Sequence, residues 1–200
     1  MEIVKHLINS ITQKGLEPSI NLDRPNYVQP EDRIQFRAMR LIIILGKLNT
    51  DNGLSKEIIS CVDFLLRNEH FQTKFILEYY AGKKNVLNKL NTIEKTNQIE
   101  IDFNIVQYKS VPWDLRFNDM LMYLFIRDLI DYKVDKDNKN TRIKLSDQGI
   151  KSFNLLESIF PSEVNFLSLF GKRMDTNKTI KIITEIIPNS YWKQNAEIDY

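Results

Sequence analysis

One stretch in the second half of the chain constrains the fold more than any other. Residues 114–131 predict a long helix, because their apolar side chains, at both ends and along one face, indicate burial in a core. Residues 132–134 and 141–145 then alternate in polarity, and residues 137–140 between them supply a polar turn. Ser146 caps another helix directly behind the second predicted strand.

This order of helix, charged hairpin and capped helix indicates the second half of a winged helix-turn-helix. Two earlier helices, predicted over residues 31–49 and 55–68, supply the first half. We therefore predict a mainly α (α+β) fold, a winged helix-turn-helix with an inserted helical and strand segment and extra C-terminal helices. The predicted divisions are an N-terminal helix and extended arm at 1–30, a winged-helix core at 31–160 with an insertion at about 69–113, and C-terminal helices with a tail at 161–200.

The insertion has its own pattern. Apolar spacing predicts a segment over residues 71–80 and a helix over residues 83–97, and alternation predicts a strand over residues 99–107. Residues 110–113 are expected to close the insertion and to lead into the long helix. The basic surface of the predicted helix is formed by Lys83, Lys84, Lys89 and Lys95.

The N-terminal part combines a short amphipathic helix with an irregular connection. The helix is predicted over residues 2–14, and residues 15–30 contain three prolines and no helical period. The connection is either an arm that lies on a partner or an ordered surface loop. In the next helix, the side away from the apolar face is expected to be solvated, and it carries Arg33, Arg37 and Arg40.

Composition and charge narrow the class of protein. The chain has 28 Lys and Arg against 26 Asp and Glu, and this balance predicts no general attraction for nucleic acid. Its longest strongly apolar run is far too short to cross a membrane, and its first residues do not form a convincing signal peptide. Cys61 lies among apolar neighbours and is predicted to be a small core residue. We expect a soluble, cytoplasmic protein.

Local charge bears on DNA binding. On the predicted helix at 114–131, two cations and four carboxylates give a net charge of −2, which phosphates would repel. These charges are Arg116, Arg127, Asp114, Asp119, Asp128 and Asp131, with Asn118 as a neutral side chain that could reach a base. The hairpin has a net charge of +3 and is a candidate for contact with a DNA backbone through Lys133, Lys136, Lys139, Arg142 and Lys144. A solvated hairpin of alternating charge is the alternative.

No pattern in the sequence predicts catalysis, a metal ion or a cofactor. His6 and His70 have no partners at metal-ligand spacing, and there is no Gly-rich phosphate loop. Glu100 and Asp102 alternate on the predicted strand, as acidic pairs do in some nucleases, but the further acid and lysine expected with them are missing. We expect a protein that is not an enzyme and that takes no small-molecule substrate.

Two short segments resemble a known family. Residues 58–66, IISCVDFLL, carry an apolar DFLL centre, and residues 143–149 end the hairpin with I-K-L-S-D-Q-G. With the chain length, they resemble the small middle component of ABC-three-component systems, which include the Lamassu-type antiphage operons. The resemblance covers residues 33–170. It implies a winged-helix accessory subunit of an SMC-like or ABC-type ATPase, which joins the ATPase to an effector, often a nuclease.

The leading hypothesis is therefore a non-enzymatic bridging subunit of such a complex. The acidic, apolar helix suits a protein contact, with candidate interface residues Trp113, Arg116, Asn118, Asp119 and Arg127. Non-specific DNA contact through the hairpin is compatible with this role. One alternative is a winged-helix DNA-binding transcription regulator that uses the hairpin and the lysines between residues 83 and 95. A third hypothesis is a small nuclease around Glu100 and Asp102.

Overall fold

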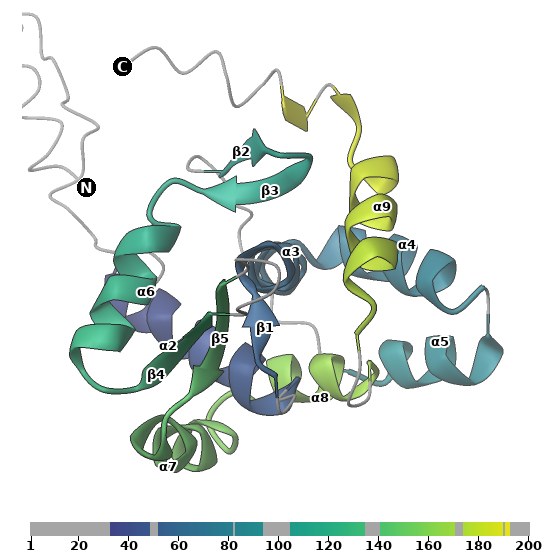
Figure 1. The fold of residues 1–200 in the computed structure, drawn as a ribbon. Helices are drawn as coiled ribbons and strands as arrows, with labels where there is room; N and C mark the ends of the chain where they lie inside the picture. The colour runs from purple at the N-terminus through teal and green to yellow at the C-terminus, as the bar shows by residue number, and fades with distance from the viewer. Residues whose placement is uncertain are drawn as a thin grey trace, which may run out of the picture.

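This computed structural model combines helices with two small antiparallel sheets, and the two-stranded sheet lies at the edge of the helical part (Figure 1). The structure describes residues 33–48, 52–81, 83–93, 105–134, 141–170, 174–189 and 191–192. Their elements are α2 (Ile34–Lys47), β1 (Leu54–Ser55), α3 (Lys56–Arg67), α4 (Glu69–Tyr79), α5 (Lys84–Asn91), β2 (Ile105–Tyr108), β3 (Val111–Asp114), α6 (Phe117–Ile126), β4 (Ile130–Val134), β5 (Thr141–Leu145), α7 (Asp147–Leu156), α8 (Pro161–Ser168) and α9 (Thr176–Ile186). The predicted mainly α (α+β) class is confirmed. The predicted N-terminal helix, the Pro-containing connection and the turn at 137–140 lie outside the described residues.

The three-stranded sheet has the order β1-β5-β4. The predicted hairpin forms its larger part, with Tyr132 opposite Ile143 in antiparallel register. On the other side of β5, Leu54 pairs with Ile143 and adds β1, a strand that the sequence did not predict. Two residues are too few to show an alternating pattern. Ser55 also caps α3, since its hydroxyl accepts a hydrogen bond from the backbone N–H of Ile58.

Helix α2 lies at the centre of the helical part. It contacts α3, α6, α7, α8 and β5, and Leu41, Ile43 and Ile44 are completely buried. A helix that is apolar on most of its sides is stable only when other elements cover those sides. The apolar run of this segment therefore forms the centre of a core, to which α3 contributes Ile59 and Phe64.

The inserted segment packs against the rest of the protein. Helix α4 contacts α3, α5 and α9, and the hairpin β2–β3 lies on α3. Lys109 and Ser110 form the hairpin turn with φ of 48° and 66°, as expected of a tight two-residue turn. The predicted strand over 99–107 is thus found from Ile105 to Tyr108, and residues 99–104 lie outside the described residues. Residues 111–113 do not simply lead into a helix, because they pair with β2 as strand β3.

The long helix predicted over 114–131 is shorter at both ends. Asp114 is the last residue of β3, and α6 ends at Ile126. The backbone then turns at Asp128, whose φ is 55°, and the Leu129 N–H donates to the carbonyl of Leu124. This is the hydrogen-bond pattern of a helix that ends with a left-handed residue. Glycine usually occupies that position, so an aspartate there gave no signal of the helix end.

A network of buried charges connects three elements. Asp114 in β3 forms ion pairs with Arg37 of α2 and Arg67 of α3, the latter at 3.2 Å. Asp63 of α3 pairs with Arg67 at 3.2 Å and with Arg40 of α2 at 3.5 Å. The prediction that Arg37 and Arg40 face solvent is wrong, because they are only 3% and 2% exposed. Their carboxylate partners come from later elements, which periodicity within one helix does not show.

A second connection joins the start of α7 to the corner between α6 and β4. The Ser146 backbone N–H donates to the Leu129 carbonyl at 3.2 Å, and its hydroxyl donates to the Asp128 carbonyl. The same hydroxyl accepts from the Gly149 N–H at 3.0 Å. A Cβ atom on Gly149 would lie 2.0 Å from the Leu129 carbonyl oxygen. The S-D-Q-G sequence thus caps the helix and allows two backbones to approach closely.

Replacing Asp114 with asparagine is expected to lower the free energy of unfolding by about 3–5 kcal/mol, because two buried arginines would lose a charged partner. Urea denaturation followed by circular dichroism measures this loss. Asp119→Asn, at an exposed position in α6, is the matched control and should change stability by less than about 0.5 kcal/mol. Equal effects of the two changes would show that the network does not stabilise the fold.

Gly149→Ala is expected to destabilise the protein by about 1–3 kcal/mol, because the added methyl group would clash with the Leu129 carbonyl. Thermal denaturation of this variant is compared with that of Lys151→Ala, at an exposed position in the same helix. If Gly149→Ala raised the melting temperature, as helix propensity alone would predict, the close approach described above would be wrong.

Candidate functional site

Helix α6 has apolar side chains on two faces. One face packs against α2 and buries Met120, Leu121 and Leu124. The other face leaves Met122, Phe125 and Ile126 exposed. A helix that buries one face needs a single apolar stripe, so the second set of apolar residues has no role in the described core. The prediction that both ends of residues 114–131 lie in a core is confirmed for Ile130 and wrong for Leu115, and Phe125 and Ile126 are also exposed.

These residues extend into a larger apolar surface across the neighbouring strand. The rings of Phe125 and Tyr132 lie 5.3 Å apart and connect α6 to β4, which lie side by side in Figure 1. Ile126 is 75% exposed and Val134 is 61% exposed. We call this surface the α6–β4 face, and it consists of Met122, Phe125, Ile126, Tyr132 and Val134. Apolar residues gathered in this way are typical of sites that contact other proteins.

Three of the predicted interface residues lie beside the α6–β4 face. Asn118 and Asp119 are exposed on the first turn of α6, and the Asn118 side chain accepts a hydrogen bond from Lys56 at 3.5 Å. At the other end of the helix, the Arg127 guanidinium lies 4.6 Å from the centre of the Tyr123 ring. These polar side chains form part of a rim around the apolar residues.

The other two predicted interface residues have structural roles. Trp113 is half-buried, with its ring 4.7 Å from that of Phe117 and 5.3 Å from that of Tyr108. Arg116 precedes α6, and its backbone N–H donates to the Asp114 carboxylate at 2.8 Å. Trp113 therefore fixes the hairpin β2–β3 against the start of α6.

The net charge of −2 predicted for this helix is wrong. Asp114 is buried in β3, Asp128 lies in the turn after α6, and Asp131 belongs to β4. Asp119 is the one carboxylate among residues 117–126. The exposed side of α6 is therefore mainly apolar rather than acidic, and the charge argument against DNA does not hold. The excess of apolar residues in the sequence FNDMLMYLFI was the signal that could have identified this surface.

The described cations of the β4–β5 hairpin have partners within the protein. Lys144 forms an ion pair with Asp131 at 3.5 Å. The Lys133 ammonium donates to the Asn52 side chain at 3.4 Å, and the Arg142 guanidinium donates to a backbone carbonyl, also at 3.4 Å. The other two predicted DNA contacts, Lys136 and Lys139, lie outside the described residues.

An apolar groove of about 250 Å³ lies behind the α6–β4 face, between α2, α6 and α7. It is lined by Met39 of α2, Tyr123 of α6 and Leu155 of α7. Leu155 is 72% exposed, although the α7 pattern gave no sign of which of its apolar residues stay outside. A second, polar pocket of about 690 Å³ lies between the starts of α3 and α9. Lys56, Arg142, Glu57 and Asp175 line it with balanced charge.

The described residues give little indication of a catalytic or metal-binding site. Among them, no three His, Cys, Asp or Glu side chains gather as a metal site would require. The ring of His70 lies 3.7 Å from that of Phe71, and Glu100 and Asp102 lie outside the described residues. Cys61 is completely buried, as predicted for a core residue. Burial, with a smaller effect from the charge of Glu57, raises the pKa of its thiol.

None of the described helices has both the length and the apolar character needed to cross a bilayer. Comparisons with protein family models, with curated proteins and with solved structures found no match to this chain.

Cys61 is expected to react with a thiol reagent at least about a hundredfold more slowly in the folded protein than in the unfolded chain. The reagent needs an exposed thiolate, which the fold provides only when it opens. Reaction with Ellman's reagent, with and without guanidinium chloride, measures the ratio. Because Cys61 is the one cysteine in the chain, the measured rate needs no correction for other thiols. Equal rates would mean that α3 does not shield this side chain.

Proposed function

We propose that this chain is a non-enzymatic winged-helix accessory subunit, which joins an SMC-like or ABC-type ATPase to an effector such as a nuclease in antiphage defence. The observation that carries the proposal is the exposed α6–β4 face. In a winged helix, the third helix is the one that reads DNA, and α6 would be that helix if α4, α5 and β2–β3 are an insertion. Its outer side presents Met122, Phe125 and Ile126 instead of base-reading side chains.

The order of elements supports the winged-helix part of the proposal. Helices α2, α3 and α6 would be its three helices, and β4 and β5 its wing. Strand β1, between the first two helices, pairs with β5, so the sheet order β1-β5-β4 joins the wing to the start of the motif. The inserted α4, α5 and β2–β3 then separate α3 from α6.

The character of the α6–β4 face supports a protein partner. Protein interfaces bury apolar and aromatic side chains at their centre and keep polar side chains at the rim. Phe125, Tyr132 and Ile126 would form such a centre, with Asp119 and Arg127 at the rim. A DNA-binding surface instead needs cations that neutralise phosphates. Those of the hairpin that the structure describes have intramolecular partners.

The ATPase and the effector enter the proposal through the family resemblance. In the structure, residues 58–66 lie in α3, and all of them are buried. Ser146 and Gly149 of the second segment hold α7 against the corner after α6. The residues of the resemblance thus maintain the fold, and the α6–β4 face provides the surface for the partner.

The chain, expressed with its neighbouring genes, is expected to co-purify with an ATPase in a fixed ratio that native mass spectrometry can measure. Met122→Lys with Ile126→Lys should reduce recovery of the partner at least about tenfold, because buried cations would disrupt an apolar contact. Leu77→Lys is the matched control, since Leu77 is also exposed near the end of a helix but lies in α4. It should retain the partner.

Two results would contradict this proposal. Recovery of the wild-type chain alone, as a monomer, would favour the DNA-binding regulator. Recovery of the ATPase with both variants alike would show that another surface makes the contact. Circular dichroism of each variant establishes that it is folded.

A further inference from the structure

Helix α5 has an outer surface without any carboxylate. The sequence from residue 83 to residue 93, KKNVLNKLNTI, contains three lysines and three asparagines and no Asp or Glu. All six of these side chains belong to exposed residues. We call this surface the α5 basic face, and it consists of Lys83, Lys84, Asn85, Asn88, Lys89 and Asn91.

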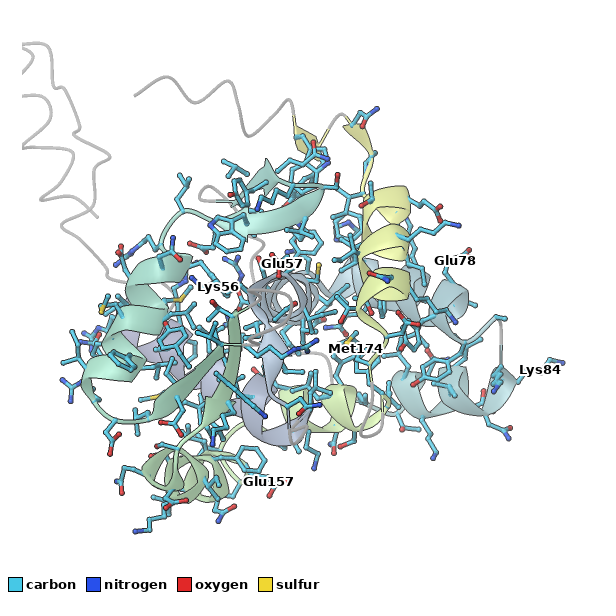
Figure 2. All side chains as sticks on the ribbon, viewed as in Figure 1. Lys56, Glu57, Glu78, Lys84, Glu157 and Met174 are labelled. Carbon is cyan, nitrogen blue, oxygen red and sulfur yellow. The ribbon has the colours of Figure 1, made fainter. Side chains whose placement is uncertain are left out.

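The cations of the α5 basic face have no partner among the described residues. In the part of the chain that the structure describes, the ammonium groups of Lys83, Lys84 and Lys89 make no hydrogen bond, ion pair or ring contact. Lys84 points away from the body of the protein, whereas the labelled Glu78 lies on the neighbouring α4 (Figure 2). The three lysines of α5 therefore differ from the described hairpin cations, which have partners within the chain. An unpaired cation can contact a phosphate without first losing a partner.

The opposite side of α5 holds the helix in place. Leu90 is 3% exposed, and Val86 and Leu87 pack against the core next to α4. Since its apolar side is occupied, α5 has no apolar face to insert into a membrane. Lys89 also borders a groove of about 370 Å³ between α5 and α8, where exposed Asn165 is a further donor. The α5 basic face is thus a set of donors on a helix held in place by its apolar side, rather than a membrane anchor.

The spacing of these donors fits a nucleic acid backbone. At about 100° per residue, Lys84, Asn88 and Asn91 lie on one side of α5, and Lys83 and Lys89 flank them on either side. Each strand of duplex DNA carries a phosphate about every 3.4 Å of its axis, so donors that are spread along and around α5 can contact more than one phosphate. Lysine ammonium and asparagine amide groups both donate to phosphate oxygens without reading base sequence.

We propose that the α5 basic face binds the phosphodiester backbone of duplex nucleic acid, independently of base sequence. This inference does not depend on the protein partner proposed above. In Figure 1, α5 and α6 lie at opposite ends of the molecule, so one surface can be occupied while the other holds a different partner. The inference assigns nucleic acid contact to the inserted segment rather than to α6 or the hairpin.

The experiment measures binding of the full chain to a short fluorescein-labelled DNA duplex of arbitrary sequence, by anisotropy, between about 50 and 200 mM NaCl. The wild-type chain is expected to bind at low salt, with equal affinity for a second, unrelated sequence. The triple variant Lys83→Gln, Lys84→Gln, Lys89→Gln should bind at least about tenfold more weakly at low salt. The plot of log affinity against log salt should also become less steep, by about 0.9 for each lysine that contacts a phosphate.

The matched control is Lys133→Gln, Arg142→Gln, Lys144→Gln, which removes three positive charges from the hairpin. It should keep the wild-type affinity and slope. A larger loss with the hairpin variant, or equal losses with both variants, would overturn the assignment to α5. The wild-type chain could fail to bind duplex DNA at low salt but bind a duplex RNA of the same sequence through α5. That result would support the proposed phosphate contact and identify RNA as the ligand.

Two further probes test the class of partner. Vesicles that contain phosphatidylserine, and polyglutamate as an acidic peptide, are titrated with the same variants. Binding of either probe through the three lysines, without binding of a nucleic acid duplex, would overturn the proposal. Arg142 is half-buried and the other changed side chains are exposed, and circular dichroism establishes that every variant is folded.

Discussion

Five charged side chains meet in the interior of this protein, where an uncompensated charge would cost several kcal/mol. Asp63 and Asp114 each contact two arginines, and Arg67 joins the two aspartates. Charges at this depth are tolerated only when their partners are positioned accurately. The network therefore fixes α2, α3 and β3 relative to one another more strictly than apolar packing does, since apolar side chains can shift against each other at a smaller cost.

The network also explains why the insertion is part of the fold. Asp114 lies at the end of the inserted segment, yet it pairs with arginines of the two helices that precede that segment. The hairpin β2–β3 must therefore lie on α3, and the chain enters α6 directly from this fixed point. As a result, α6 packs one face on α2 and directs its other apolar face outward. The position of the proposed interface thus depends on a charge pairing at the entrance to α6.

Local patterns predicted much of this structure, and long-range partners account for the rest. Periodicity and capping predicted α2, α3 and α7, and alternation predicted the β4–β5 hairpin, because these signals act within a few residues. The burial of Arg37 was not predictable, since its partner lies far along the chain. The end of α6 was missed because Asp128 occupies a position where glycine is usual. Of the candidate site, the sequence located the helix and the rim residues Asn118, Asp119 and Arg127, whereas the exposure of Phe125 and Ile126 depends on how the helix packs.

The aromatic contacts of Tyr191 have a consequence for synthesis of the protein. Its ring meets those of Phe64 and Phe71 edge-on, at 6.0 and 5.8 Å, and α9 covers the same region of α3 and α4. The residues that close this part of the core are thus translated long after those that they cover. Until they emerge from the ribosome, Phe64 of α3 and Phe71 of α4 lack this cover, and apolar surface that is exposed during folding promotes aggregation.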